Sequence, residues 1–184
     1  MTLLFMTLLL AGALGAAAAP QPGTKTMGPP GKPVVDASFQ LRAPEGWSVE
    51  KKPGGAVLTG PAAEGLPARV ILRYVRPGHA LYADPHAYMA RLTKPSSIPM
   101  KGWKNGPVEK TVAAGRRALR LERDTTEFIP PESMASKEVA VREEHLAVYA
   151  SAGFYLLVYS APRSIDAAQR RVWRGIVAGF KPKF

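Results

Sequence analysis

Apolar and polar residues alternate with a period of two along most of the chain after residue 36, which indicates strands that bury one face. The clearest example is 68–76, in which Val70, Leu72 and Tyr74 share one face and the residues between them share the other. Other strands are predicted at 36–43, 47–50, 56–59, 107–112, 115–123, 138–149 and 154–159. Because Pro and Gly residues mark short turns between them, we expect neighbouring strands to pair antiparallel.

Two of these strands depart from simple alternation. One carries its apolar residues at odd positions first, Val139 and Val141, and then at even positions, Leu146 and Val148. A β-bulge near the middle of this strand would bring both halves onto one face. The run 154–159 is apolar at nearly every position, which predicts a central strand covered on both faces.

Two helices are predicted among the strands. Asp84 is a suitable N-cap and Pro85 a favoured first residue for a helix that runs to about Leu92. Ser164 is the predicted N-cap of a terminal helix with an apolar stripe facing the sheet. The stripe consists of Val172, Trp173, Ile176, Val177 and Phe180. We therefore expect 36–184 to form one α+β domain, an antiparallel sheet with helices packed on it.

The N-terminal part of the chain has no such pattern. Residues 1–19 are almost wholly apolar and end in a run of alanines, which is typical of a signal peptide. No Lys or Arg precedes Lys25, so an uncleaved membrane anchor stays open as an alternative. Residues 20–35 are rich in Pro and Gly, and we expect a disordered linker there. The expected location is therefore periplasmic or secreted.

The composition adds a strong positive charge and the absence of cysteine. The formal net charge is +11 at pH 7, from 25 Lys and Arg against 14 Asp and Glu. A basic surface attracts anionic partners, which for an exported domain are acidic proteins, anionic lipids or envelope polymers. Nucleic acid is a further alternative, although the sequence carries no recognition motif for it. With no cysteine, disulfides, thiolate metal sites and a lipid anchor on an N-terminal Cys are excluded.

Seven arginines form three groups, each predicted to share one face of an element. The groups are Arg69 with Arg73, Arg116 with Arg120, and Arg170 with Arg171 and Arg174, the last on the outer face of the terminal helix. Two groups that adjoin in space would form an anion-binding patch. The alternative is a solvated basic surface interspersed with acidic residues such as Glu122.

Catalytic or metal-binding chemistry has weaker support. His79, Asp84 and His86 could supply metal ligands, but their spacing matches no motif with a known mechanism. Glu143 and His145 alternate along a predicted strand and could share a face as an acid/base pair. No nucleophile elbow, phosphate-binding glycine loop or zinc-protease motif is present, so we expect no enzyme activity and no metal or cofactor.

Three segments and the terminal helix resemble the PsbP/Mog1-like superfamily. They are Phe39 to Trp47, Gly115 to Ala118, Gly153 to Pro162, and the helix with Trp173 and Phe180. The resemblance covers almost the whole of the expected domain and implies an α/β sandwich. Members of this superfamily are mostly non-enzymatic binding or assembly modules, and many bacterial ones are small exported domains. These segments are turn and core signals, so the resemblance supports a fold more than a function.

The leading hypothesis is therefore an exported, non-enzymatic binding or assembly module of the cell envelope that engages an acidic partner through its basic surface. The first alternative is a metal-assisted or acid/base hydrolase built on His79, Asp84 and His86, or on Glu143 and His145. The second is a protein that binds extracellular nucleic acid through charge.

Overall fold

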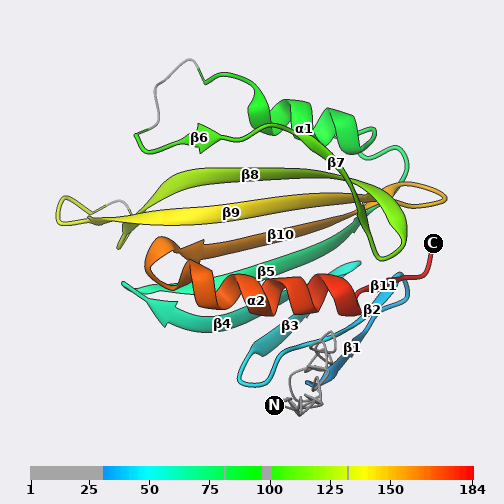
Figure 1. Cartoon of the computed structure of the whole chain (residues 1–184), viewed down its shortest axis with the longest axis horizontal. Coiled ribbons are helices and arrows are strands. Elements are labelled where there is room, and N and C mark those ends of the chain that lie inside the picture. Colours follow the sequence, from blue (N-terminus) through cyan, green and yellow to red (C-terminus); the bar gives the residue numbers. More distant parts are fainter. Residues whose placement is uncertain (1–30, 81, 97–100, 132) are drawn as a thin grey trace, which may run out of the picture.

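The computed structural model describes residues 31–80, 82–96, 101–131 and 133–184, and within them it shows two antiparallel sheets and two helices (Figure 1). The strands are β1 (Pro33–Val35), β2 (Phe39–Arg42), β3 (Ser48–Lys52), β4 (Gly55–Ala63), β5 (Leu66–Val75), β6 (Lys104–Asn105), β7 (Glu109–Ala113), β8 (Arg116–Ile129), β9 (Lys137–Tyr149), β10 (Phe154–Pro162) and β11 (Lys181–Pro182). The helices are α1 (Pro85–Thr93) and α2 (Arg163–Gly179). The predicted α+β fold is confirmed.

The large sheet has eight strands in the order β3-β4-β5-β10-β9-β8-β6, and β7 also pairs with β8. All of its pairings are antiparallel, as the short turns predicted. β10 lies in the middle, between β5 and β9, and Figure 1 shows β8, β9 and β10 between the two helices. The prediction of a central strand at 154–159 is therefore confirmed. A smaller sheet, β1-β2-β11, joins the N-terminal strands to the chain end after α2.

The bulge predicted in β9 is wrong. The register of β9 with both neighbours is unbroken, so that Glu143 lies opposite Arg123 and His145 opposite Leu121. The change of parity instead reflects two covered faces. Leu146 belongs to the core beneath α2, whereas its neighbour Ala147 belongs to the core beneath α1. Successive residues of a strand point to opposite faces, so a strand covered on both sides can be apolar at odd and even positions without a bulge.

The larger core lies between α2 and the sheet. Trp173 and Ile176 of the predicted stripe are buried, and the Trp173 ring stacks on that of Tyr159 with 5.7 Å between centroids. Phe180, just after the helix, packs edge-on against Tyr155 at 5.3 Å. The stripe is thus confirmed, but the predicted N-cap is wrong: the cap position is Pro162, and the Ser164 hydroxyl donates to Glu64 Oε1 at 2.5 Å.

A second, smaller core lies beneath α1. Asp84 caps this helix as predicted, because its Oδ1 accepts a hydrogen bond from the Ala87 amide at 2.8 Å. Tyr88 and Met89 are buried against apolar residues of β8, β9 and β10. The helix is short, so packing rather than helix propensity stabilises it. The side chains at this join between α1 and the sheet form the candidate site described below.

The folded domain begins earlier than predicted. Residues 1–30, which include the expected signal peptide at 1–19 and most of the expected linker at 20–35, lie outside the described residues. The last part of the linker prediction is wrong, because Pro33–Val35 pairs with β2 and Val34 is buried. Proline is tolerated as the first residue of such an edge strand, since it has no amide to donate. Neither helix in the described part of the chain is long and apolar enough to span a membrane.

Replacing Trp173 by Ala should destabilise the domain by about 3–5 kcal/mol, the range for truncating a large aromatic side chain in a core. The exposed neighbour Arg174 provides the control, since Arg174→Ala should stay within about 0.5 kcal/mol of wild type. Denaturant unfolding measures both. Equal stability of Trp173→Ala and wild type would mean that α2 does not pack on the sheet as described.

Candidate functional site

A pocket with aromatic and cationic walls lies at the join between α1 and the sheet. Its volume is about 250 Å³. It is lined by Tyr82, Tyr88, Arg91, Leu92, Lys94, Trp103 and Arg123, and we call it the aromatic–cationic pocket. None of these seven side chains is acidic, and three of them are cationic. The pocket therefore offers positive charge and flat apolar surfaces to a ligand.

Three elements place these side chains together. α1 contributes Tyr88, Arg91 and Leu92, which are spaced so that Arg91 and Leu92 lie one turn after Tyr88 on the same side of the helix. Arg123 points to the same side of the sheet as the buried Leu121, two residues earlier on β8. β6 pairs with β8 opposite Arg123, and Asn105 on β6 donates its side-chain amide to the Leu92 carbonyl at 3.4 Å. This hydrogen bond links α1 to β6, the strand that directly follows Trp103.

A buried chain of polar side chains runs beneath the pocket, and we call it the buried relay: Arg123, Glu143, His145 and Tyr88. The Arg123 Nε donates to Glu143 Oε2. His145 Nε2 lies 3.0 Å from the same oxygen, and His145 Nδ1 lies 2.7 Å from the Tyr88 hydroxyl. His145 and Tyr88 are only 4% and 5% exposed. The relay thus satisfies the polar atoms of a histidine that is otherwise surrounded by core.

The charges of the relay follow from its surroundings. Burial opposes ionisation of Glu143, but the hydrogen bond from His145 and the nearby Arg123 guanidinium outweigh it and hold the Glu143 pKa below its ordinary value. Burial, reinforced by the neighbouring Tyr82, raises the pKa of the Tyr88 hydroxyl, which therefore keeps its proton. An ionised Glu143 can only accept hydrogen bonds, so His145 donates one from Nε2. When the imidazole ring is neutral, its Nδ1 accepts a hydrogen bond from the Tyr88 hydroxyl.

The aromatic rings of the pocket are already in contact with cations. The Arg123 guanidinium lies 5.0 Å from the centre of the Trp103 ring, and that of Arg91 lies 5.8 Å from the Tyr82 ring. Tyr82 also packs edge-on against Tyr88, with 5.1 Å between centroids. Cation–π contacts of this kind hold guanidinium groups in place while leaving their N–H donors available. The arrangement is suited to binding an anion beside a flat ring.

The three residues predicted as metal ligands make other contacts in the structure. Asp84 caps α1 through Oδ1. His79 stacks on Tyr82 with 5.3 Å between centroids, and its Nε2 lies 3.4 Å from Arg73. His86 packs edge-on against Tyr149 at 6.3 Å. Among the residues that the structure describes, no group of three or more His, Asp and Glu side chains could hold a metal ion. These three residues therefore give the metal-assisted alternative no geometric support.

The predicted pairing of Glu143 with His145 on one face of β9 is confirmed by their 3.0 Å contact. The acid/base role is not favoured, however. Both ring nitrogens of His145 are engaged, one by Glu143 and the other by Tyr88, so neither is directed at a ligand in the pocket. A general base needs a lone pair within reach of the proton that it removes.

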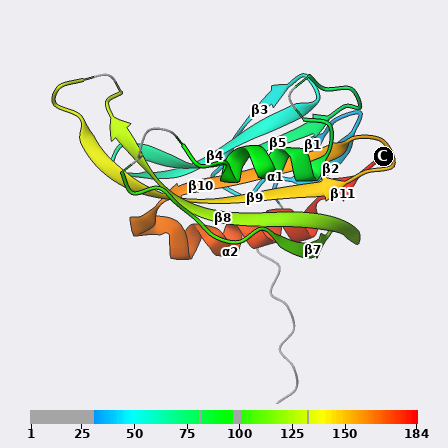
Figure 2. The same ribbon diagram turned by 90° about the horizontal axis from the view of Figure 1, so that it is seen from above.

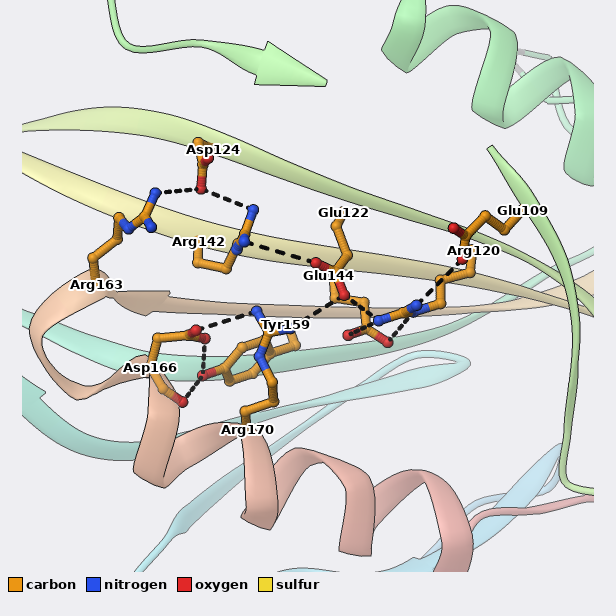
Figure 3. A network of polar contacts seen from close by, with 10 residues as sticks. All are labelled: Glu109, Arg120, Glu122, Asp124, Arg142, Glu144, Tyr159, Arg163, Asp166 and Arg170. Carbon is orange, nitrogen blue, oxygen red and sulfur yellow. Dashed lines mark hydrogen bonds and ion pairs between the residues drawn. The ribbon is translucent and has the colours of Figure 1, made fainter. Parts of the chain in front are cut away.

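Two of the three predicted arginine groups do adjoin, on the α2 side of the sheet, but through shared carboxylates (Figure 3). Glu122 accepts from both Arg120 and Arg170, the latter at 3.1 Å. Arg120 also pairs with Glu144 at 3.1 Å and Glu109 at 3.3 Å. Arg170 further donates to Asp166 at 3.1 Å, as Figure 3 shows. Acidic side chains occupy these guanidinium groups, so this junction is an internal ion-pair network and not an anion-binding patch.

The prediction that Arg170 faces outward is therefore wrong. Its side chain is only 18% exposed because it turns toward the sheet to reach Glu122. Arg171 and Arg174 are exposed on α2, as expected. Arg116 donates to the carbonyl of Phe184.

Arg69 and Arg73 lie elsewhere, exposed on β5 and on the α1 side of the sheet. Arg73 contacts His79, which stacks on Tyr82, one of the residues that line the aromatic–cationic pocket.

The residues that line the pocket were not predicted from the sequence. One signal could have found Arg123: it shares the odd parity of Leu119 and Leu121, which are buried, so a cation stands in line with a core face. Such a residue needs an acidic partner or a ligand. Tyr88 and Leu92 are four residues apart in the predicted helix and so share a face, but nothing in the sequence shows that Tyr88 meets His145, 57 residues away.

The Glu143 carboxylate should stabilise the folded protein in a pH-dependent way. Its pKa is lower in the folded chain than its ordinary value of 4.5, so its contribution is complete above about pH 5 and is lost as the pH falls through the folded value. Glu143→Gln should cost roughly 2–3 kcal/mol at neutral pH, the worth of hydrogen bonds to a charged group. This difference from wild type should shrink as the pH is lowered.

Denaturant unfolding at a series of pH values between about 3 and 6 measures the effect. Glu127→Gln is the matched control, since that side chain is exposed on the neighbouring strand and its loss should stay within about 0.5 kcal/mol. A stability difference for Glu143→Gln that is the same at every pH would contradict the assignment of an ionised, hydrogen-bonded Glu143.

No protein-family model matches this chain, and no curated protein matches it. Solved structures do resemble it. LpqN of Mycobacterium tuberculosis, described as involved in cell envelope biogenesis, matches with a TM-score of 0.51 and 13% identity, over 81% of this chain and 88% of LpqN. A protein of unknown function from Pseudomonas aeruginosa matches with a TM-score of 0.50 and 14% identity, over 83% of this chain and 96% of that one.

The solution structure of cyanobacterial PsbP from Synechocystis also matches, over 89% of this chain and 99% of PsbP, at 11% identity. Its TM-score is 0.48. At identities of this order, likeness shows a shared fold and leaves function open. The chain thus shares its α+β fold with LpqN and the Pseudomonas protein, and a PsbP structure is among those that it resembles, as the sequence led us to expect.

Proposed function

We propose that this chain is an exported, non-enzymatic binding or assembly module of the cell envelope that engages an acidic partner through the α1 side of its sheet. The observation that carries the proposal is a set of exposed cations there, which we call the basic face: Arg69, Arg73, Arg91 and Lys94. No ion pair within the described residues involves any of them. Their charge is therefore available to an anionic partner.

The contrast with the α2 side supports this choice of surface. There, Arg120, Arg142 and Arg170 each contact a carboxylate, and an ion pair of this kind leaves little net field for a partner. With a net charge of +11, the chain carries an excess of cations that these pairs do not neutralise. Two cations of the basic face, Arg91 and Lys94, line the aromatic–cationic pocket, and Arg73 contacts His79, which stacks on the lining residue Tyr82.

The location is proposed on separate grounds. Residues 1–19 have the pattern of a signal peptide, and the expected partners of an exported basic domain are acidic proteins, anionic lipids and envelope polymers. LpqN, which shares the fold, is described as involved in cell envelope biogenesis, and we extend that setting to this chain as part of the proposal.

Replacing both Arg69 and Arg73 by Gln should weaken binding to vesicles that contain anionic lipid. Each cation near such a surface contributes about 1 kcal/mol, so the double variant should bind more than about tenfold less tightly at low salt. The matched control is Arg171→Gln with Arg174→Gln, which removes the same charge from the exposed side of α2. Co-sedimentation with the vesicles measures both, and the melting temperatures should stay close to wild type.

Raising the ionic strength to about 0.15 M, where the screening length is near 8 Å, should weaken binding by the wild-type protein as well. Equal losses in the two double variants would show that net charge, and not the basic face, determines binding. Failure of the wild-type protein to bind anionic vesicles, an acidic polysaccharide or an acidic protein at low salt would overturn the proposal, and a preference for DNA over all three would favour nucleic acid.

The signal-peptide hypothesis predicts that exported protein begins between Ala18 and Gln21, just after the run of alanines. Expression of the full chain in a secreting bacterial host, followed by N-terminal sequencing of the exported fraction, measures this. Recovery of Met1 at the N-terminus would contradict cleavage and favour an anchor.

A further inference from the structure

We propose that the aromatic–cationic pocket binds a small ligand, or the terminal group of a larger one, in which a carboxylate or phosphate is attached to a flat unsaturated ring. This inference deepens the proposed function, since it rests on an anionic partner at the α1 side and names the chemistry that the pocket would recognise. It depends on three features of the pocket: an oriented guanidinium, two aromatic walls and a small volume.

The oriented guanidinium belongs to Arg123. Its side chain is 13% exposed, and within the described residues its hydrogen bonding goes to Glu143 alone, through Nε. The two Nη amines are left for a ligand, and they form the planar fork that binds a carboxylate or phosphate through two parallel hydrogen bonds. Arg91 and Lys94 add two further positive charges at the same pocket. An anion bound there would be stabilised by three cations.

The relay determines what the floor of the pocket can offer. Glu143 Oε2 contacts both Arg123 Nε and His145 Nε2, and His145 Nδ1 in turn lies 2.7 Å from the Tyr88 hydroxyl. When the Tyr88 hydroxyl donates its hydrogen bond to His145, it has no second donor to offer a ligand. Tyr88 therefore contributes ring surface, and the cations alone decide where the anionic group binds.

The aromatic walls determine the shape of the rest of the ligand. Trp103 is 43% exposed although the Arg123 guanidinium lies over its ring, so part of the ring is accessible to a ligand in the pocket. Tyr82 is half-buried on the same pocket, held by His79 and Tyr88. Rings prefer to stack on other rings and on planar groups. A flat ligand can contact these walls while its anionic group reaches Arg123.

The volume limits the size of the ligand. At about 250 Å³, the pocket is smaller than the roughly 300–1,000 Å³ of sites for drug-sized molecules. One ring with its acidic group is a suitable occupant, whereas a dinucleotide is too large. A polymer could place only an end group here.

A second cavity is less suited to binding an anion. It has a volume of about 330 Å³ and is lined in part by Arg120 and Arg142, but also by Glu109, Glu122 and Asp124. Its arginines already bind these carboxylates, at 3.3 Å for Arg120 with Glu109 and 3.0 Å for Arg142 with Asp124. An anion would have to displace them. The aromatic–cationic pocket has no acidic lining residue and needs no such exchange.

The test is isothermal titration calorimetry on the full chain with four probes. Benzoate and phenyl phosphate carry an anion on a flat ring, benzamide carries the ring without charge, and acetate carries the charge without a ring. We expect at least one of the first two to bind about tenfold more tightly than both benzamide and acetate, since charge and ring each contribute. The tighter of the two identifies carboxylate or phosphate as the preferred group. No saturable binding of either at millimolar concentrations, or equal binding of all four, would overturn the proposal.

Variants locate the binding. Arg123→Lys keeps the charge but loses the fork, and it should weaken binding by about tenfold. Arg142→Lys is the matched control, on the adjacent strand and the opposite face of the sheet, and it should leave the affinity unchanged. Because Arg123 is largely buried, Trp103→Ala provides a second variant at an exposed position, and it should weaken binding of the ring-bearing probes alone. Equal affinities for wild type, Arg123→Lys and Trp103→Ala would overturn the assignment to this pocket.

The two proposals fail in different ways. Anionic vesicles that bind through Arg69 and Arg73, together with ring-bearing probes that do not bind, would overturn the pocket ligand and leave the proposed function standing. Probes that bind through Arg123 and Trp103, together with vesicles, acidic polysaccharide and acidic protein that do not bind, would overturn the basic face as a partner surface and confirm a small-ligand site.

Discussion

The rest of the structure depends on β10, a strand that is covered on both faces and paired along both edges. It joins β5 to β9, and thereby the N-terminal hairpins to the β8–β9 hairpin. Tyr155 and Tyr159 lie beneath α2, whereas Phe154 and Leu156 lie beneath α1. A strand enclosed in this way must satisfy every polar atom internally. The two tyrosine hydroxyls do so, since that of Tyr155 donates to the Ser38 carbonyl at 2.6 Å and that of Tyr159 to Asp166 Oδ1 at 3.1 Å.

The two faces of the sheet differ in how their charged side chains are paired. β8 sends Arg120 and Glu122 to the α2 side and Arg123 to the α1 side, because neighbouring residues of a strand point in opposite directions. On the α2 side, cations and carboxylates neutralise each other in a network that packs beneath the helix. On the α1 side, a single carboxylate, Glu143, holds Arg123, and none of the residues that line the pocket is acidic. Exposed cations without a carboxylate partner therefore lie beside the pocket on the α1 side, as well as on the outer side of α2 at Arg171 and Arg174.

The contacts that dock α1 on the sheet also form one wall of the pocket. Tyr88 belongs to the core beneath α1, lines the pocket and binds His145 of β9. If α1 moved away from the sheet, the pocket would lose a wall and the relay would lose the partner of a buried histidine. Leaving that nitrogen unpaired in the core would cost more than a surface contact, so the relay couples the geometry of the site to the stability of the fold.

The sequence by itself determined the elements and the faces of individual strands and helices. The cap at Asp84, the stripe around Trp173, the central strand at 154–159 and the shared face of Glu143 and His145 all follow from local rules about spacing and capping, and each is present in the structure. Nearest neighbours along the chain decide these features, so the sequence records them directly.

Only the tertiary structure decided which element covers each face and which charges meet. It removed the bulge expected in β9, turned Arg170 inward to Glu122, drew Pro33–Val35 into a sheet and brought Tyr88 to His145 across 57 residues. The physical reason is that a period of two identifies the residues on one face of a strand, but not the partner that packs on that face. Ion pairs and pockets depend on that partner, because they form between segments distant in the sequence.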